Sequence, residues 1–206
     1  MVEPVNPLKI LVCGHFAREV ETILREDGFE DAVCYTFAPS CIRPQQAESI
    51  LATLGSSLFD DSSKAILVGG CYLSRKKQLD TLPPQVRVHN LENCFYCLVS
   101  KEYVDEWLKH GGYLVSPGWL VHWRQTMSQW DFNQKTARAF FHEFTKTLVL
   151  LDTGVYADSA VTLKEFADFL DLPFQIVRVG LGHLRLILKR IVLEWRLEQI
   201  QKVSAL

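Results

Sequence analysis

From residue 8 onward, short runs rich in β-branched residues alternate with longer amphipathic runs. Strands that are apolar along their whole length, each followed by a helix, are typical of a parallel sheet covered by helices on both faces. The fold class predicted from this alternation is therefore α/β, with a parallel or mostly parallel sheet. The expected strands are residues 9–16, 31–38, 64–72, 85–91, 112–117, 146–154 and 174–180.

The intervening segments predict helices at residues 17–28, 45–58, 133–144 and 159–172, and a helical stretch at 93–112 that is interrupted near Ser100. The aromatic-rich segment 118–132 fits neither period. A chain of 206 residues can form one compact domain or two small lobes. We expect one α/β domain over residues 1–180. The alternative is two Rossmann-like lobes with a hinge around residues 110–130.

The last segment, residues 181–206, predicts a long amphipathic helix. Leu186, Leu193 and Ile200 are spaced seven apart, and Leu197 lies four after Leu193. This spacing on a charged background favours a helix that leaves the domain and pairs with a second copy, although the same leucines could pack on the sheet. We therefore expect a homodimer through this helix, with a downstream signalling output domain as a further partner.

Charge and hydropathy exclude several classes of partner and location. The formal net charge is −2, and the basic residues are scattered, so a nucleic-acid partner is not expected. The N-terminus lacks a signal-peptide pattern, and no apolar run approaches the ~18 residues of a membrane span. The sequence predicts a cytoplasmic protein, in which six cysteines are better explained by burial, catalysis or metal binding than by disulfides.

Four cysteines fall at or just after the ends of the first four expected strands: Cys13, Cys41, Cys71 and Cys94. Ligands gather at the carboxyl ends of strands in parallel α/β sheets, so the four thiols are expected to converge there. Four thiolates suit zinc, an iron–sulfur cluster or one position on a larger cofactor. The competing interpretation treats the cysteines as small buried apolar residues, which fits Cys34 well.

The pair Cys94 and Cys97 has C-x-x-C spacing, but the two residues are expected to differ. Asn93 is a good N-cap, which places Cys94 in the first helical turn, where a thiolate is stabilised. Cys97, one turn further on and flanked by apolar residues, is expected to pack in the core.

Other strand ends carry polar or aromatic candidates for cofactor binding, each with a structural alternative. His15 and His89 could bind a ligand or be hydrogen-bonded core residues. Ser116 and Trp119 could form the wall of a pocket or a packed corner. Asp152 could contact a metal-bound water or cap a helix. The common nucleotide-binding and hydrolase motifs are missing.

Five segments, ILVCGHFAREV, AILVGGCYLS, HNLENCFYCLVSKEYVDEWL, GGYLVSPGWLVHW and VLLDTGVY, resemble the domain of unknown function 1638 (DUF1638) up to about residue 180. The resemblance assigns motif positions to Cys13–Gly14, Gly70–Cys71, Glu92–Asn93–Cys94 and Ser116–Trp119. The chain has Glu-Asn where the family tends to have His-Asp, and Cys41 where histidine is more usual. The family's association with methylamine and corrinoid metabolism implies a soft metal or a corrinoid as cofactor.

Three hypotheses follow. In the first, the chain is a cytoplasmic sensor domain for signal transduction, in which a ligand or a metal ion, most plausibly zinc, binds the cysteine site and biases the C-terminal helix. In the second, it is an enzyme of corrinoid or methyl-transfer chemistry, with Cys94 as the thiolate and His15 or Asp152 assisting. In the third, it is a structural dimerisation module.

Overall fold

The computed structural model describes residues 6–39, 41, 63–69 and 82–204 and contains two parallel sheets. The first sheet has the order β2-β1-β3-β4, and the second has the order β5-β6-β7. All seven expected strands are confirmed: β1 (Leu8–Cys13), β2 (Ala32–Phe37), β3 (Lys64–Val68), β4 (Val86–Asn90), β5 (Gly112–Val115), β6 (Thr147–Asp152) and β7 (Phe174–Arg178). The predicted α/β class is therefore confirmed. The chain forms two parallel sheets, as in the two-lobed alternative, rather than one.

Helices connect the strands. They are the 3₁₀-helix η1 (Gly14–Phe16), α1 (Ala17–Glu26), the 3₁₀-helix η4 (Cys94–Cys97), α4 (Lys101–Lys109), α5 (Pro117–Leu120), α6 (Trp123–Gln129), α7 (Gln134–His142), α8 (Ser159–Leu170) and α9 (Gly182–Ser204). Those expected at residues 17–28, 93–112, 133–144 and 159–172 are confirmed, and the segment 118–132, which fitted neither period, is also helical in part. The expected break near Ser100 is confirmed, because Ser100 caps α4 through its hydroxyl and separates it from η4. The helix expected at 45–58 lies outside the described residues.

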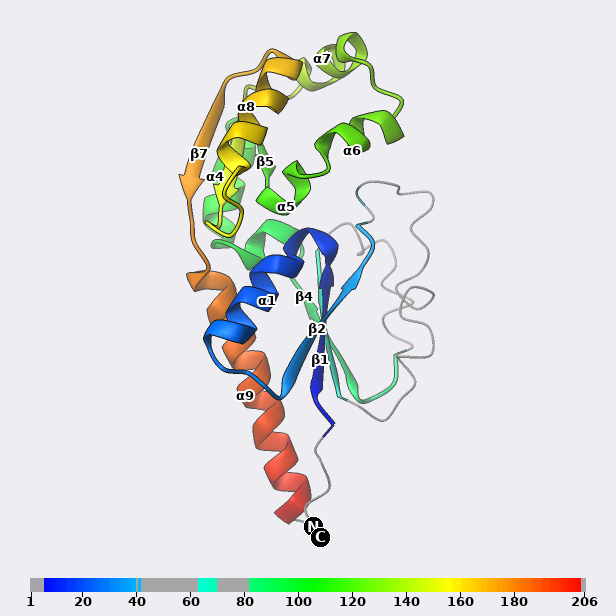
Figure 1. The fold of residues 1–206 in the computed structure, drawn as a ribbon, viewed down its shortest axis with the longest axis vertical. Helices are drawn as coiled ribbons and strands as arrows, with labels where there is room; N and C mark the ends of the chain where they lie inside the picture. Colours follow the sequence, from blue (N-terminus) through cyan, green and yellow to red (C-terminus); the bar gives the residue numbers. More distant parts are fainter. Residues whose placement is uncertain (1–5, 40, 42–62, 70–81, 205–206) are drawn as a thin grey trace.

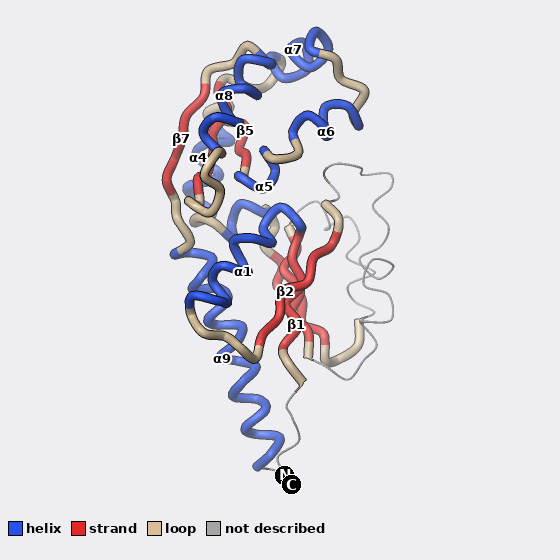
Figure 2. Tube along the Cα trace, viewed as in Figure 1, coloured by secondary structure: helices blue, strands red, loops and turns tan. Residues whose placement is uncertain are grey.

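Each sheet forms one lobe, and the carboxyl ends of the strands of both sheets face the boundary between the lobes (Figures 1 and 2). The chain passes from the first lobe to the second through residues 91–111, which lie before most of the segment expected to be the hinge. It returns through the end of β7 and α9, which packs against α1 of the first lobe. The chain therefore crosses the boundary twice.

The two lobes share an apolar core. One buried cluster joins Val12 and Val20 of the first lobe to Leu114, Val149 and Leu151 of the second. A second cluster, built around α5, α6, α7 and α8, fills the far side of the second sheet with tryptophan and phenylalanine rings. Because the first cluster spans the boundary, the cleft has a fixed apolar floor.

Helix α9 does not leave the domain, in contrast to the prediction from its heptad spacing. It runs from the second lobe along α1 and the first sheet (Figure 1) and buries one face, formed by Leu184, Leu188, Ile191, Val192 and Trp195. The predicted seam points away from the protein: Leu186, Leu193, Leu197 and Ile200 are 52–69% exposed. The alternative, in which Leu186, Leu193 and Ile200 pack on the sheet, is therefore wrong, and the seam is open on the surface.

Candidate ligand-binding cleft

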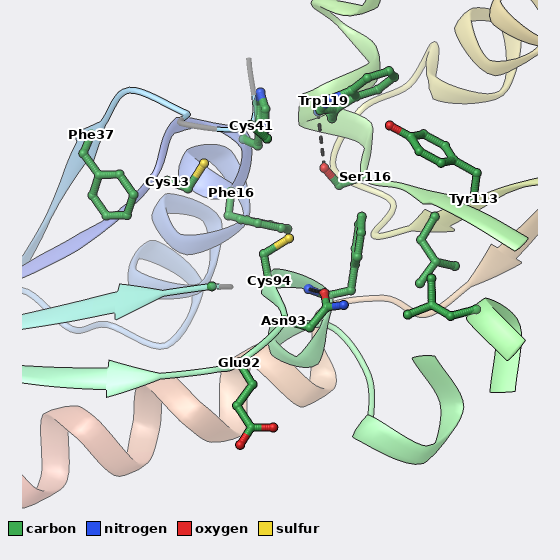
Figure 3. A pocket seen from close by; sticks show the side chains of 15 residues that line it. Cys13, Phe16, Phe37, Cys41, Glu92, Asn93, Cys94, Tyr113, Ser116 and Trp119 are labelled. Atoms are coloured by element: carbon green, nitrogen blue, oxygen red, sulfur yellow. Dashed lines mark hydrogen bonds between the residues drawn. The ribbon is translucent and has the colours of Figure 1, made fainter. Parts of the chain in front are cut away.

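A cavity of about 330 Å³ lies where the strand ends of the two sheets meet. The size is within the range of small-molecule sites in proteins. Figure 3 shows that both lobes contribute to it: Cys13, Phe16 and Cys94 come from one side, and Tyr113, Ser116 and Trp119 from the other. Its lining residues are Cys13, His15, Phe16, Phe37, Cys41, Gly69, Glu92, Asn93, Cys94, Phe95, Leu108, Tyr113, Leu114, Ser116 and Trp119.

Two glycines allow the backbone segments of the cleft to approach closely. A Cβ atom added at Gly69, just after β3, would lie 2.7 Å from the Cβ atom of Cys94. A Cβ atom added at Gly118 would lie 2.0 Å from the carbonyl oxygen of His15, in the other lobe. Real Cβ atoms do not tolerate such distances, so glycine at both positions sets the spacing of the cleft walls.

Cys94 enters the cleft at the start of η4, as predicted. The Asn93 side chain accepts a hydrogen bond from the Phe95 backbone N–H at 3.0 Å and fixes the start of this helix. Cys97 is buried, which confirms its expected packing role. Burial raises the pKa of the Cys97 thiol well above its usual value, with smaller contributions from Cys94, Glu19 and Cys13.

His15 and Ser116 are the buried polar side chains among the described lining residues, at 5% and 2% exposure. The His15 Nδ1 atom lies 4.0 Å from the Cys41 sulfur, whereas its Nε2 atom has no hydrogen-bond partner among the described residues. Burial lowers the pKa of His15 to about 4, and the nearby His122 adds to the effect. His15 is therefore neutral at pH 7, with Nδ1 beside the Cys41 thiol and Nε2 buried.

Three of the four predicted metal ligands come together. Cys13, Cys41 and Cys94 all line the cavity, while Cys71 lies outside the described residues. Within the described part of the chain, no three histidine, cysteine, aspartate or glutamate side chains form a group that could hold a metal ion. The four-thiolate site thus stays a prediction, although the convergence at strand ends on which it rests is present.

The predicted aromatic wall is present and extends beyond Trp119. The Tyr113 and Trp119 rings meet edge to face, with centroids 6.3 Å apart. Ser116, at the N-cap of α5, accepts a hydrogen bond from the Trp119 backbone N–H at 3.3 Å (Figure 3). Burial raises the pKa of Tyr113, and Cys41 and Cys94 add to the shift. Tyr113 is a lining residue that sequence reasoning missed, because its position in a strand indicated only a core role.

Two other predicted residues do not reach the cleft. Asp152, at the end of β6, accepts hydrogen bonds from the Gly154 N–H at 3.1 Å and the Ser159 hydroxyl at 3.3 Å, so it organises the loop before α8. His89 lies in a separate cavity between α9 and the first sheet. Neither residue can act together with the thiols in this arrangement.

Glu19 joins the lobes behind the cleft. It lies in α1 and is fully buried, and its Oε1 atom accepts a hydrogen bond from the Thr153 hydroxyl of the second lobe at 3.0 Å. Its Oε2 atom has no hydrogen-bond partner in the part of the chain that the structure describes. Burial raises the pKa of Glu19, opposed by its own backbone N–H, Thr153 and Arg18. Sequence analysis did not predict this contact, because a glutamate in an amphipathic helix normally faces solvent.

The protein is a two-lobed α/β protein with a pocket between the lobes. Each lobe contains a parallel sheet, and thiols and aromatic rings line the pocket. The family model of the protein of unknown function DUF1638 matches residues 51–188, more than half of the chain, and the chain belongs to that family. No curated protein and no solved structure matches the chain. No helix among the described residues is long and apolar enough to cross a membrane.

Proposed function

We propose that the protein is a ligand-sensing domain that binds a small molecule in the interlobe cleft. The observation that carries this proposal is the cavity of about 330 Å³ to which both lobes contribute. A ligand there contacts residues after β1 and η1 on one side and residues after β5 on the other. Its binding energy can therefore favour one arrangement of the lobes over another, which is what a sensor requires.

Helix α9 is the element that can transmit the change. It follows β7 of the second lobe, packs on α1 of the first, and contacts η4, which carries Cys94. Leu184, in its first turns, lines a small cavity of about 20 Å³ together with Cys94 and Cys97. A shift of η4 on ligand binding would thus move α9, whose open seam of Leu186, Leu193, Leu197 and Ile200 is proposed to bind a second copy.

A soft metal ion is the second candidate for the bound species. It is favoured by the three thiols of Cys13, Cys41 and Cys94 in one cavity, because thiolates select zinc, Cu(I) and iron–sulfur clusters. The enzymatic alternative has less support. Asp152 accepts a hydrogen bond within its own loop, from the Gly154 N–H. The thiol beside the His15 ring is that of Cys41 and not that of Cys94.

The experiment compares the protein isolated from its own cells with the variant Leu108→Trp. Leu108 lines the cleft from α4 and is 46% exposed, so a larger ring fills the mouth with little strain on the core. Bound small molecules are extracted and identified by mass spectrometry, and metal content is measured on the same samples. We expect a compound that the wild type retains and Leu108→Trp loses. A wild type that carries neither compound nor metal would contradict the proposal.

Matched cysteine variants separate the two candidates. If a metal is the bound species, Cys41→Ser and Cys94→Ser lower its content, whereas Cys34→Ser does not, because Cys34 lies in β2 and does not line the cleft. Burial raises the pKa of the Cys34 thiol to about 12. If a small molecule is bound, Leu108→Trp lowers the amount that is retained, and that amount does not depend on the metal content.

A further inference from the structure

Strand β7 forms an open edge of the second sheet. The strand order β5-β6-β7 places it last, and Figure 1 shows it along the outer side of the second lobe. Among the described residues, no strand pairs with this outer side of β7. An edge strand presents backbone N–H and C=O groups to which another extended chain can form hydrogen bonds.

The outward backbone groups of β7 belong to alternate residues. Before the strand begins, the Pro173 carbonyl accepts a hydrogen bond from the Leu148 N–H at 2.9 Å. After it ends, the Val179 N–H donates to the Asp152 carbonyl at 2.9 Å. Because the N–H and C=O groups of successive strand residues point to opposite sides, every second residue between these two also faces β6. The residues whose backbone groups face outward are therefore Phe174, Ile176 and Arg178.

The side chains of these three residues are exposed on one face of the sheet. Phe174 and Ile176 are 38% and 40% exposed, and they share a face because strand side chains alternate. Arg178 is exposed as well and is the one charged residue of β7. Proteins commonly protect an edge strand with lysine, proline or a bulge. Strand β7 instead offers two large apolar side chains and one cation to a neighbour.

A second copy of β7 complements this edge when it runs antiparallel about a two-fold axis at Ile176. Opposite residues with outward backbone groups then exchange both of their hydrogen bonds. Ile176 meets its own counterpart, and Phe174 meets Arg178 of the second copy. A guanidinium group beside an aromatic ring is attractive, and the same register keeps the two arginines apart. The edge is thus self-complementary in hydrogen bonds, apolar contact and charge.

We propose that β7 joins two copies of the chain edge to edge, so that their three-stranded sheets form one continuous sheet. This interface lies on a different element from the α9 seam, and it does not depend on a ligand in the cleft. A chain that uses both surfaces forms an assembly larger than a dimer.

Sedimentation of the full chain carrying Leu193→Asp, which weakens pairing through α9, tests the β7 interface by itself. We expect this chain to form a dimer. Adding Ile176→Lys places two like charges at the two-fold axis and should raise the dissociation constant about ten-fold or more. Val33→Lys is the matched control, because Val33 is also 40% exposed and lies on β2, an edge strand of the first sheet. It should leave the dissociation constant unchanged.

Two substitutions at Phe174 test the register in the same background. Phe174→Lys places a cation opposite Arg178 of the second copy and should weaken the dimer about ten-fold or more. Phe174→Glu places a carboxylate there and should leave the dimer at least as stable as its parent. Thermal melts of all variants show that they are folded, which is expected because the substituted side chains are exposed.

Each result supports or overturns the interface. A Leu193→Asp chain that sediments as a monomer overturns pairing through β7 and leaves the cleft and the α9 seam as proposed. Equal effects of Ile176→Lys and Val33→Lys overturn it as well. Equal effects of Phe174→Lys and Phe174→Glu overturn the antiparallel register. A monomer that binds a synthetic peptide of alternating threonine and valine, and loses it with Ile176→Lys, assigns the edge to a strand of another protein and overturns self-pairing.

Discussion

Replacing Glu19 with glutamine should stabilise the protein in a pH-dependent manner. The Glu19 carboxyl is fully buried, with a hydrogen bond from Thr153 and one oxygen that has no partner among the described residues. Burial raises its pKa above the ordinary 4.5, so the folded chain keeps a proton that the unfolded chain releases. Stability is therefore lost as the pH rises from about 4.5 through the raised pKa of the folded state, and it is constant on either side of that window.

Glutamine keeps the shape of the side chain and an oxygen that can accept from Thr153, and it carries no charge. Leaving a buried polar group without a partner costs about 1 to 3 kcal/mol, and more when the group is charged. We expect Glu19→Gln to raise the free energy of unfolding by about 1 to 3 kcal/mol at pH 8. The gain should shrink as the pH falls and disappear below about pH 4.5.

Urea unfolding followed by tryptophan fluorescence, at intervals between pH 4.5 and pH 8, measures this difference. Glu21→Gln is the matched control, because Glu21 lies in the same helix and is exposed, so its variant should change stability little at any pH. A difference between Glu19→Gln and the wild type that does not vary with pH would refute the reasoning. A variant less stable than the wild type at pH 8 would refute it as well.

Two further predictions concern the lobe boundary and α9. Gly118→Ala should lower the free energy of unfolding by about 3 kcal/mol or more, because the added Cβ atom meets the His15 carbonyl oxygen. Gly182→Ala is the control: its added Cβ atom has open space, so the free energy of unfolding should change by no more than about 1 kcal/mol. Leu193→Asp should weaken the proposed homodimer at least ten-fold in sedimentation experiments. Val161→Asp, on α8, should leave it intact, although Val161 is 63% exposed and Leu193 is 52% exposed. A monomeric wild type would contradict the dimer.

The strands and most of the site could be predicted because they depend on local pattern. Apolar runs of five or six residues mark strands, and parallel sheets bring the residues after those strands to one edge, so Cys13 and Cys94 could be placed at a common site. Ser116 and Trp119 followed from the same rule. Asp152 also lies at a strand end, but its carboxylate points to its own loop. The Gly154 N–H and the Ser159 hydroxyl donate hydrogen bonds to it there, which strand order does not predict.

Contacts between the lobes could not be predicted, because they depend on the mutual placement of two sheets. Glu19 and Thr153 are 134 residues apart and meet only in the folded chain. Helix α9 illustrates the same limit. Its sequence carries two apolar stripes, one at Leu184, Leu188 and Ile191 and one at Leu186, Leu193 and Ile200, and periodicity alone does not tell which one the protein buries.

The two stripes of α9 also explain how a cleft ligand could affect a second copy of the chain. The buried stripe packs α9 against α1 and η4, and in the proposed homodimer the exposed stripe would be the contact surface. Because both stripes belong to one rigid helix, a displacement of its inner face is transferred to its outer face without any further element. A sensor built in this way requires only that the ligand contact η4 and α5 differently in the paired and unpaired states.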